Sequence, residues 1–379
     1  MFNTIRSKTW SPASSKPKIT RPSHHRNDQG TAFKNPWTSA NPPSWTELLL
    51  QGTFPLGWYD DLTKRHPETR DIKVVAPDWG AAVLKASGLS RQECVVGTTL
   101  GHAGAIVELP LGGTAKHGEA KKSLWILYDP IFSRRAGPTQ YTGPGRMRPS
   151  PCQVSDLPGC DVIMISHNHY DHLDLATIET LLKKFPKAIY FVPLGNKRWL
   201  CSLGVKEARV QELDWWQNRE YSVQDFGYEG FSTFSQDVLL RFTCVPAQHN
   251  SGRDVCPVFK EIGQKFGPFD LSFIPIWRGG TLGFISNIGL RLSHNDIPTT
   301  FHTSPLDAID IHKDVQSRNT VAVHFGTFIG SQNESLESIM EFEEARDKRN
   351  VLALDAQSPD DRDRAGCINI GASFAARMS

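Results

Sequence analysis

Three histidines and two aspartates crowd into eight residues of the chain, at His167, His169, Asp171, His172 and Asp174. Neutral imidazoles and carboxylates this close compete for the same solvation, whereas a divalent cation such as zinc would bind several of them together. His167 and His169 alternate, so an extended turn can direct both toward one ion, while Asp171 and His172 lie past the bend and can reach a second. The spacing predicts a metal site in preference to a solvated loop that happens to be rich in histidine.

Two later histidines stand where apolar strands are expected to end. His249 follows the strand expected at residues 238–243, and His324 closes the apolar run 320–323. A single histidine at a strand end is more often an ordinary hydrogen-bonding residue, but beside the upstream cluster these two would complete three ligands for each ion. Three protein ligands leave a position for water, which is typical of a catalytic rather than a structural zinc site.

Alternating short strands and helices must position these side chains. Period-two and continuous apolar patterns predict strands at residues 105–109, 123–128, 161–165, 188–192, 238–243, 271–276 and 320–323. Helices are predicted at residues 174–184, 257–266 and 304–313, the last beginning with a Ser-Pro cap. Strands followed by strands mixed with covering helices favour a layered α/β sandwich over a simple doubly wound sheet.

Composition excludes several classes of protein. The 379 residues carry a net charge of +2, which argues against a protein built around nucleic-acid phosphates. No run of about 18 apolar residues is present to span a bilayer. The seven cysteines are scattered, with neither zinc-ribbon spacing nor the density of a disulfide scaffold. They predict reduced thiols in an intracellular protein.

The first 45 residues differ from the remainder. They hold seven basic residues against one acidic residue, with six Pro and seven Ser. This composition predicts a disordered basic tail at 1–45, or alternatively a mitochondrial import segment, although its prolines would break an amphipathic helix. Residues 46–379 are then expected to form a single domain.

The motifs together resemble the metallo-β-lactamase superfamily, and within it the N-acylphosphatidylethanolamine-hydrolysing phospholipases D and their fungal relatives. The resemblance is nearly continuous from about residue 95 to 330. Its pieces are residues 100–103, 129–134, 148–152, 165–174, 192–195, 212–216, 246–249, 266–271, 274–276, 312–316 and 324–328.

The resemblance implies a four-layered αβ/βα sandwich with two zinc ions at the rim of its sheets. One ion would be held by His167, His169 and His249, and the other by Asp171, His172 and His324. Asp171 would also orient the attacking water. The implied reaction is hydrolysis of an N-acylated phosphatidylethanolamine to an N-acylethanolamine and phosphatidic acid, at a peripheral membrane surface or in mitochondria.

The sequence departs from the family after His249. Members of the family carry further strands and a Gly-Asp-Thr-Gly loop, whose carboxylate bridges the two ions, before the Cys-Pro that begins a helix. Here only residues 250–255 separate His249 from Cys256, and Asp254 is the one nearby carboxylate. We therefore expect two strands to be missing and the second zinc to bind weakly. The chain could be a truncated active enzyme, a variant in which Asp254 substitutes for the bridge, or a metal-poor lipid-binding or scaffold protein.

The sequence leaves two possible roles open for several residues and segments. His102 and His302 could contact the ligands or the substrate phosphate, or make ordinary hydrogen bonds. The segments 277–292 and 45–58 could pack on their own domain or form an apolar lip beside the metals. A homodimer is also compatible with the sequence. Another hydrolase of the same superfamily, such as a thioesterase, is the alternative enzyme, because the motif sets the metals and not the substrate; a nuclease is disfavoured because the acidic globular part offers no basic track.

Overall fold

The computed structural model describes residues 3–5, 22–40, 56–58, 71–111, 123–228, 239–248, 256–277, 290–292, 303–328, 332–356 and 363–378. Its larger sheet has seven strands in the order β15-β3-β4-β5-β6-β7-β8. Neighbours pair antiparallel from β15 to β5 and parallel from β5 to β8. The strands are β3 (Cys94–Gly101), β4 (Gly104–Pro110), β5 (Ser123–Tyr128), β6 (Val162–Met164), β7 (Ile189–Pro193), β8 (Val210–Leu213) and β15 (Ser373–Arg377).

The smaller sheet has four strands in the order β1-β11-β13-β14, in which β11 and β13 are parallel. Its strands are β1 (Asn3–Ile5), β11 (Leu271–Pro275), β13 (Asn319–Val323) and β14 (Arg364–Gly366). Two antiparallel ribbons accompany the sheets. They pair β9 (Asn218–Ser222) with β10 (Leu239–Thr243), and β2 (Leu56–Trp58) with β12 (Leu290–Leu292).

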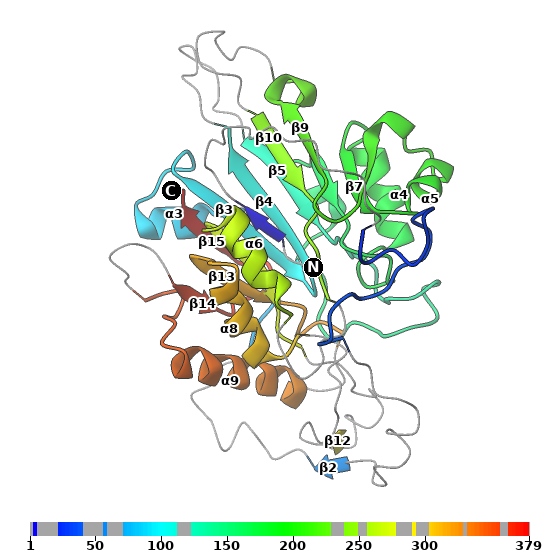
Figure 1. Cartoon of the computed structure of the whole chain (residues 1–379). Coiled ribbons are helices and arrows are strands. Elements are labelled where there is room, and N and C mark those ends of the chain that lie inside the picture. The colour runs from blue at the N-terminus through cyan, green and yellow to red at the C-terminus, as the bar shows by residue number, and fades with distance from the viewer. Residues whose placement is uncertain are drawn as a thin grey trace.

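Helices cover the outer face of each sheet (Figure 1). On the larger sheet lie α4 (Leu175–Lys184) and α5 (Lys197–Ser202), and α3 (Ala81–Ser87) packs near the edge formed by β15 and β3. On the smaller sheet lie α6 (Val258–Phe266), α8 (Pro305–Asp314) and α9 (Gln332–Lys348). Helices, sheet, sheet and helices form four layers.

Three apolar clusters hold these layers together. Val107 and Ile126 of the larger sheet meet Phe273 and Val321 of the smaller sheet in the central cluster. The second cluster buries Ile178 and its neighbours between α4 and the larger sheet, and the third lies between the smaller sheet and its three helices. The four-layered α/β sandwich predicted from the sequence is therefore confirmed, while the expected loss of two strands concerns a connection outside the described residues.

The predicted elements are found within one or two residues of their expected ends. The helix expected from residue 174 is capped by the Asp174 side chain, which accepts a hydrogen bond from the Thr177 amide. The Ser304 side chain likewise accepts one from the Asp307 amide at the start of α8. Strand β3 was missed because it is buried along its whole length and shows no alternation. Helix α9 was missed because its residues are mostly charged or polar.

Residues 22–40 correct part of the expected disordered tail. His24 and His25 are buried, and both hydrogen bond to the carboxylate of Asp214. Composition could not reveal this, because the carboxylate that holds the segment belongs to a residue about 190 positions away. Residues 1–2, 6–21 and 41–45 of the predicted import segment lie outside the described residues, while β1 pairs with β11.

The segments 45–58 and 277–292, for which packing or an apolar lip was expected, pair with each other in the β2–β12 ribbon. Trp277 at the start of the second segment is half-buried against the cluster under α6 and α8. Within the described residues, no helix combines the length and apolar character needed to cross a membrane.

Candidate metal centre

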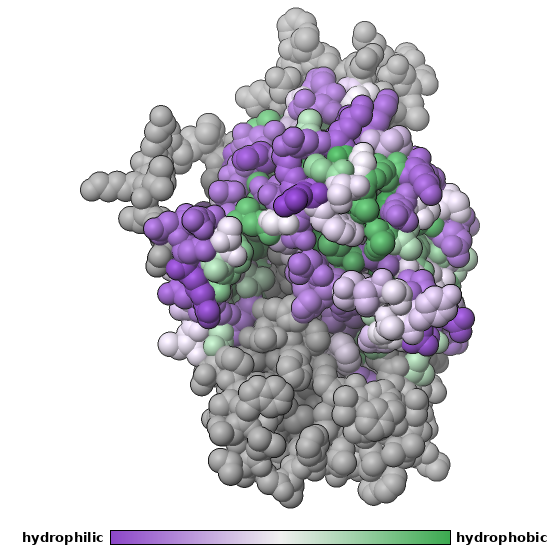
Figure 2. All heavy atoms as spheres, turned by 90° about the vertical axis from the view of Figure 1, so that its right-hand side faces the viewer, coloured by the Kyte–Doolittle hydropathy of each residue, from purple (hydrophilic) through white to green (hydrophobic). Residues whose placement is uncertain are grey.

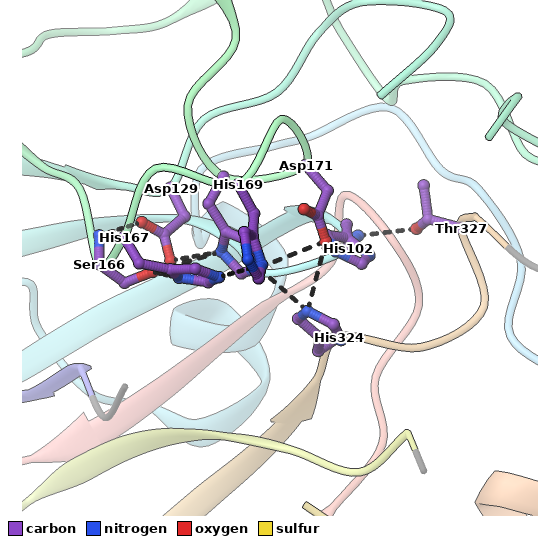
Figure 3. A network of polar contacts seen from close by, with 9 residues as sticks. His102, Asp129, Ser166, His167, His169, Asp171, His324 and Thr327 are labelled. Carbon is purple, nitrogen blue, oxygen red and sulfur yellow. Dashed lines mark hydrogen bonds and ion pairs between the residues drawn. The ribbon is translucent and has the colours of Figure 1, made fainter. Parts of the chain in front are cut away.

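Three separate parts of the chain bring histidines to one edge of the sandwich. The loop that follows β6 carries His167, His169 and His172, and it ends where Asp174 caps α4. His324 directly follows β13, and His102 occupies the turn between β3 and β4. Figure 3 shows the side chains of His102, His167, His169 and His324 directed toward one another. The carboxyl ends of β6, in the larger sheet, and of β13, in the smaller sheet, therefore position the site. The sequence predicts this placement for His324 and the His-rich loop.

One carboxylate oxygen faces three imidazoles. The Oδ2 atom of Asp171 lies 2.8 Å from Nε2 of His102, 3.4 Å from Nε2 of His172 and 3.7 Å from Nε2 of His324. The Nε2 atoms of His172 and His324 are 3.0 Å apart. The candidate ligand atoms of all four residues lie within 4.8 Å of one another. Three buried imidazoles and a half-buried carboxylate thus form a compact set of metal donors.

Asp129 fixes the orientation of His172. Its Oδ2 atom lies 2.9 Å from Nδ1 of His172, and its Oδ1 atom accepts a hydrogen bond of 2.6 Å from the Ser166 amide. A proton on Nδ1 directed at Asp129 leaves the Nε2 lone pair facing the cluster, which is the arrangement of a metal-binding histidine with a carboxylate behind it. Sequence reasoning assigned Asp129 no role, although it directly follows the predicted strand 123–128, the same position that marked His324.

The first two histidines of the loop lie beside this cluster. Nε2 of His167 is 3.0 Å from Nδ1 of His169, and Nδ1 of His167 is 2.8 Å from the Ser166 hydroxyl. The rings of His167 and His172 have centroids 4.1 Å apart. His167 is half-buried and His169 is exposed. The loop therefore brings together the two groups of donors that the sequence divides between two ions.

Backbone strain concentrates at the same place. His102, Asp129 and His324 have φ angles of 52°, 37° and 64°, in the left-handed region that non-glycine residues rarely adopt. The backbone amide of His324 donates to the carbonyl of His102 over 2.8 Å, and the hydroxyl of Thr327 accepts from the His102 amide over 2.7 Å. Such strain persists where surrounding contacts enforce it, which is common at functional sites.

The electrostatic environment favours a cation between the histidines and Asp171. Burial lowers the pKa of His102. Burial alone would also lower the pKa of His172, but the Asp129 and Asp171 carboxylates raise it to about 9. For Asp171, burial acts to raise the pKa, yet the hydrogen bonds from His102 and His172 hold it well below its ordinary value. The carboxylate is therefore charged in a largely buried setting and needs positive charge nearby.

The donor set fits a divalent metal. Two imidazole nitrogens that face each other at 3.0 Å can satisfy both lone pairs only by sharing a proton or by binding an ion between them. Imidazole nitrogen and carboxylate oxygen are ligands that zinc takes, and other first-row metals accept the same set. The cluster of His102, Asp171, His172 and His324 can therefore hold a metal ion.

Three predicted site residues lie outside the described residues: His249, Asp254 and His302. Their roles as ligand, substitute bridge and substrate contact stay predictions. His102 is placed inside the cluster, where it hydrogen bonds to Asp171 as expected for a residue that orients a ligand. Thr327 and Ser166, which hold His102 and His167, were not predicted.

Apolar side chains stand on the surface next to the loop. Tyr170 and Leu175 are 53% and 44% exposed, and both are neighbours in sequence of the candidate metal ligands. In the space-filling view of one face, a patch of apolar residues interrupts a mostly polar surface (Figure 2). A substrate with hydrocarbon chains could contact such side chains near the donors.

Comparison with known proteins finds a matching domain family and several relatives. The Beta-lactamase superfamily domain matches residues 124–258, which include the His-rich loop. N-acyl-phosphatidylethanolamine-hydrolyzing phospholipase D 1 of Caenorhabditis elegans is 29% identical over 74% of this chain and 78% of its own length. An uncharacterized protein of Mycobacterium tuberculosis is 32% identical over 54% of each chain.

A mitochondrial yeast protein of similar name is also related. N-acyl-phosphatidylethanolamine-hydrolyzing phospholipase D of Saccharomyces cerevisiae is 28% identical over 56% of this chain and 46% of its own length. The chain thus matches about half the length of the mycobacterial and yeast relatives, and more than three quarters of the nematode protein.

Proposed function

We propose that this chain, which belongs to the β-lactamase superfamily and is a homologue of the N-acyl-phosphatidylethanolamine-hydrolysing phospholipases D, is a metal-dependent lipid phosphodiesterase. Its substrate is an N-acylated phosphatidylethanolamine, and its products are an N-acylethanolamine and phosphatidic acid. The observation that carries the proposal is the convergence of three buried imidazoles on one oxygen of Asp171. This arrangement supplies metal donors at the edge of the fold where the resemblance expects them.

The side chains of the site have two kinds of role, as metal ligands and as residues that orient those ligands. Asp171, His172 and His324 would hold one ion, and His167, His169 and His249 would hold the other. A bound divalent ion would lower the pKa of water and neutralise the phosphate oxygens. Asp171 also orients the attacking water, and His102 keeps that carboxylate in place through its 2.8 Å hydrogen bond. Asp129 does the same for His172.

The identity and number of the ions belong to this proposal. Zinc suits the mixed imidazole and carboxylate donors. The second ion would bind more weakly, because the sequence lacks the family's Gly-Asp-Thr-Gly loop and Asp254 is the one carboxylate between His249 and Cys256. The membrane surface, the mitochondrion of the yeast relative and a homodimer are likewise proposed settings for the activity.

A lipid substrate agrees with the surface near the donors. Tyr170 and Leu175 offer exposed apolar area beside the loop. The first 45 residues carry a net charge of +6, which leaves the remaining chain at −4. A net negative globular part does not suit nucleic-acid phosphates.

Hydrolysis in water labelled with oxygen-18 tests the proposal directly. Attack of water at phosphorus with loss of the ethanolamine oxygen places the label in phosphatidic acid and leaves the N-acylethanolamine unlabelled. We expect this product pattern from the zinc-loaded protein, and its loss in Asp171→Asn. The matched control is Asp347→Asn on the exposed face of α9. Label in a released fatty acid would instead assign an acyl hydrolase, and binding of the lipid without any product would assign a lipid-binding protein.

A further inference from the structure

A second group of potential metal ligands shares no residue with the cluster described above. It lies where residues 22–40 contact the turn that follows β8. Nε2 of His24 is 2.7 Å from Oδ1 of Asp214, and Nε2 of His25 is 2.8 Å from Oδ2 of the same carboxylate. The candidate ligand atoms of the three residues lie within 4.8 Å of one another. Two ring nitrogens from consecutive residues therefore converge on one carboxylate.

The carboxylate in this group is largely buried. The side chains of His24, His25 and Asp214 are 8%, 10% and 12% exposed. Within the part of the chain that the structure describes, no lysine or arginine forms an ion pair with Asp214. Buried carboxylates are usually accompanied by a positive charge or a metal ion. Two neutral imidazoles provide hydrogen bonds but no charge, whereas a divalent cation held by their Nε2 lone pairs would compensate the carboxylate.

Backbone and ring contacts hold both imidazoles in this orientation. The amide of Lys34 donates to the carbonyl of His24 over 2.8 Å, which closes the loop that carries the two histidines. The ring of His24 stacks on Trp215 with centroids 4.1 Å apart, and Phe33 meets the ring of His25 edge-on at 5.3 Å. Side chains whose rotamers are fixed by packing are well prepared to bind an ion.

The turn that contains Asp214 is fixed to the sandwich. Oδ1 of Asp214 accepts a hydrogen bond of 2.8 Å from the amide of Trp215. The amide of Trp216 donates to the carbonyl of Cys244 over 2.7 Å, and the amide of Cys244 donates to the carbonyl of Gln217 over 2.9 Å. The carboxylate thus belongs to the folded domain and the two histidines to a distant segment, so an ion between them would join the two.

From this geometry we propose that His24, His25 and Asp214 bind a divalent cation of the zinc type, which docks residues 22–40 onto the sandwich. Imidazole nitrogen and carboxylate oxygen are zinc ligands, and the second carboxylate oxygen or a water would complete four positions. Tetrahedral zinc holds its donor atoms about 3.3 Å apart. The carboxylate therefore needs to withdraw only slightly from its contacts of 2.7 Å and 2.8 Å.

Replacement of both histidines by glutamine separates metal binding from hydrogen bonding. In His24→Gln with His25→Gln, each side-chain amide can still donate to Asp214, but it lacks the imidazole lone pair that binds zinc. Asp214→Asn removes the charge that the ion would compensate. The matched control is Asp28→Asn, which removes an exposed carboxylate from the same segment. Circular dichroism checks that each variant is folded.

Hydrogen exchange of residues 22–40, measured with and without zinc, is the readout. We expect zinc to slow this exchange in the wild type and in Asp28→Asn. The double glutamine variant and Asp214→Asn should each lose this protection, and elemental analysis should find one zinc per chain fewer. The protection should persist in His169→Ala with His324→Ala, which removes one proposed ligand from each ion of the other site.

Exchange of residues 22–40 that is the same with and without zinc in the wild type would overturn the proposal, and would leave the three residues as a hydrogen-bonded anchor. Protection that is lost in His169→Ala with His324→Ala but kept in the double glutamine variant would also overturn it, because the effect would then arise from the other site. These measurements use neither substrate nor turnover, so their result is independent of the proposed function.

Discussion

At the scale of single residues, the site depends on side chains that do not face the substrate. Asp129 bonds to both His172 and the Ser166 amide, and so connects strand β5 to the His-rich loop. The charge of Asp129 also stabilises a cationic or metal-bound His172, because its carboxylate raises the pKa of that imidazole. The local sequence revealed the donors but not this partner, since 43 residues separate Asp129 from His172.

Asp129→Asn should therefore impair the metal centre without removing a donor. The amide keeps one acceptor oxygen, but its NH2 group faces either the Ser166 amide or His172 and cannot accept a hydrogen bond from it. We expect about 10-fold to 100-fold weaker zinc binding and a similar fall in turnover. Chelator competition and kcat measure the two effects, and Asp347→Asn serves as the surface control. Unchanged zinc affinity would mean that Asp129 only stabilises the fold.

Loss of one ligand should be more severe. His169→Ala and His324→Ala each remove one of the three proposed protein ligands of their ion, so we expect turnover to be abolished while the fold is kept. Circular dichroism checks the fold beside the phosphodiester assay. Wild-type turnover in both variants would show that the metals are not the catalysts.

At the scale of elements, close packing of α6 on α8 holds the smaller sheet's helices in place. A Cβ atom on Gly263 would lie 2.0 Å from the carbonyl oxygen of Asp314 and 2.9 Å from the backbone of Val315. Only glycine at this position lets the two helices approach so closely. Helix α6 begins two residues after Cys256, so this packing also holds Cys256 in place.

Gly263→Ala should consequently destabilise the protein. The added methyl gains helix propensity but must push two backbones apart, and overpacking of this kind costs about 1–3 kcal/mol. Urea denaturation should show a lower midpoint with an unchanged slope. Gln264→Ala, at the next and exposed position of α6, is the matched control and should have little effect. Equal stability of both variants would show that α6 and α8 can separate freely.

The short connection after His249 gives a second prediction about elements. The six residues 250–255 span at most about 20 Å when extended, which is too short for two paired strands. Insertion of the family's longer segment with its Gly-Asp-Thr-Gly loop should raise the zinc content toward two per chain and raise both the melting temperature and turnover. If none of the three increased, the deletion would be tolerated, and Asp254→Ala would then test for a substitute bridge.

At the scale of the whole molecule, local patterns predicted most of the sandwich and the chemistry of its edge. An apolar strand followed by histidines is visible in the sequence, and so is the Ser-Pro cap at the start of α8. The paired positions of His102 and Asp171 are not, because 69 residues separate them and only the closed sheet brings them together. The ordered structure of residues 22–40 was missed for the same reason. A basic Pro-rich segment reads as solvated until Asp214 and Trp215, distant in sequence, are known to lie beneath it.

The central claim is that this edge of the sandwich binds the metal that catalyses hydrolysis of a lipid phosphodiester. The most direct measurement follows zinc content and turnover of N-acylated phosphatidylethanolamine in the same samples, first after removal of metal by a chelator and then during stepwise return of zinc. We predict that turnover falls to background without metal and rises again as zinc is restored, with at least one zinc per chain at full activity. Undiminished turnover by metal-free protein, or fully zinc-loaded protein that leaves this lipid intact, would contradict the account.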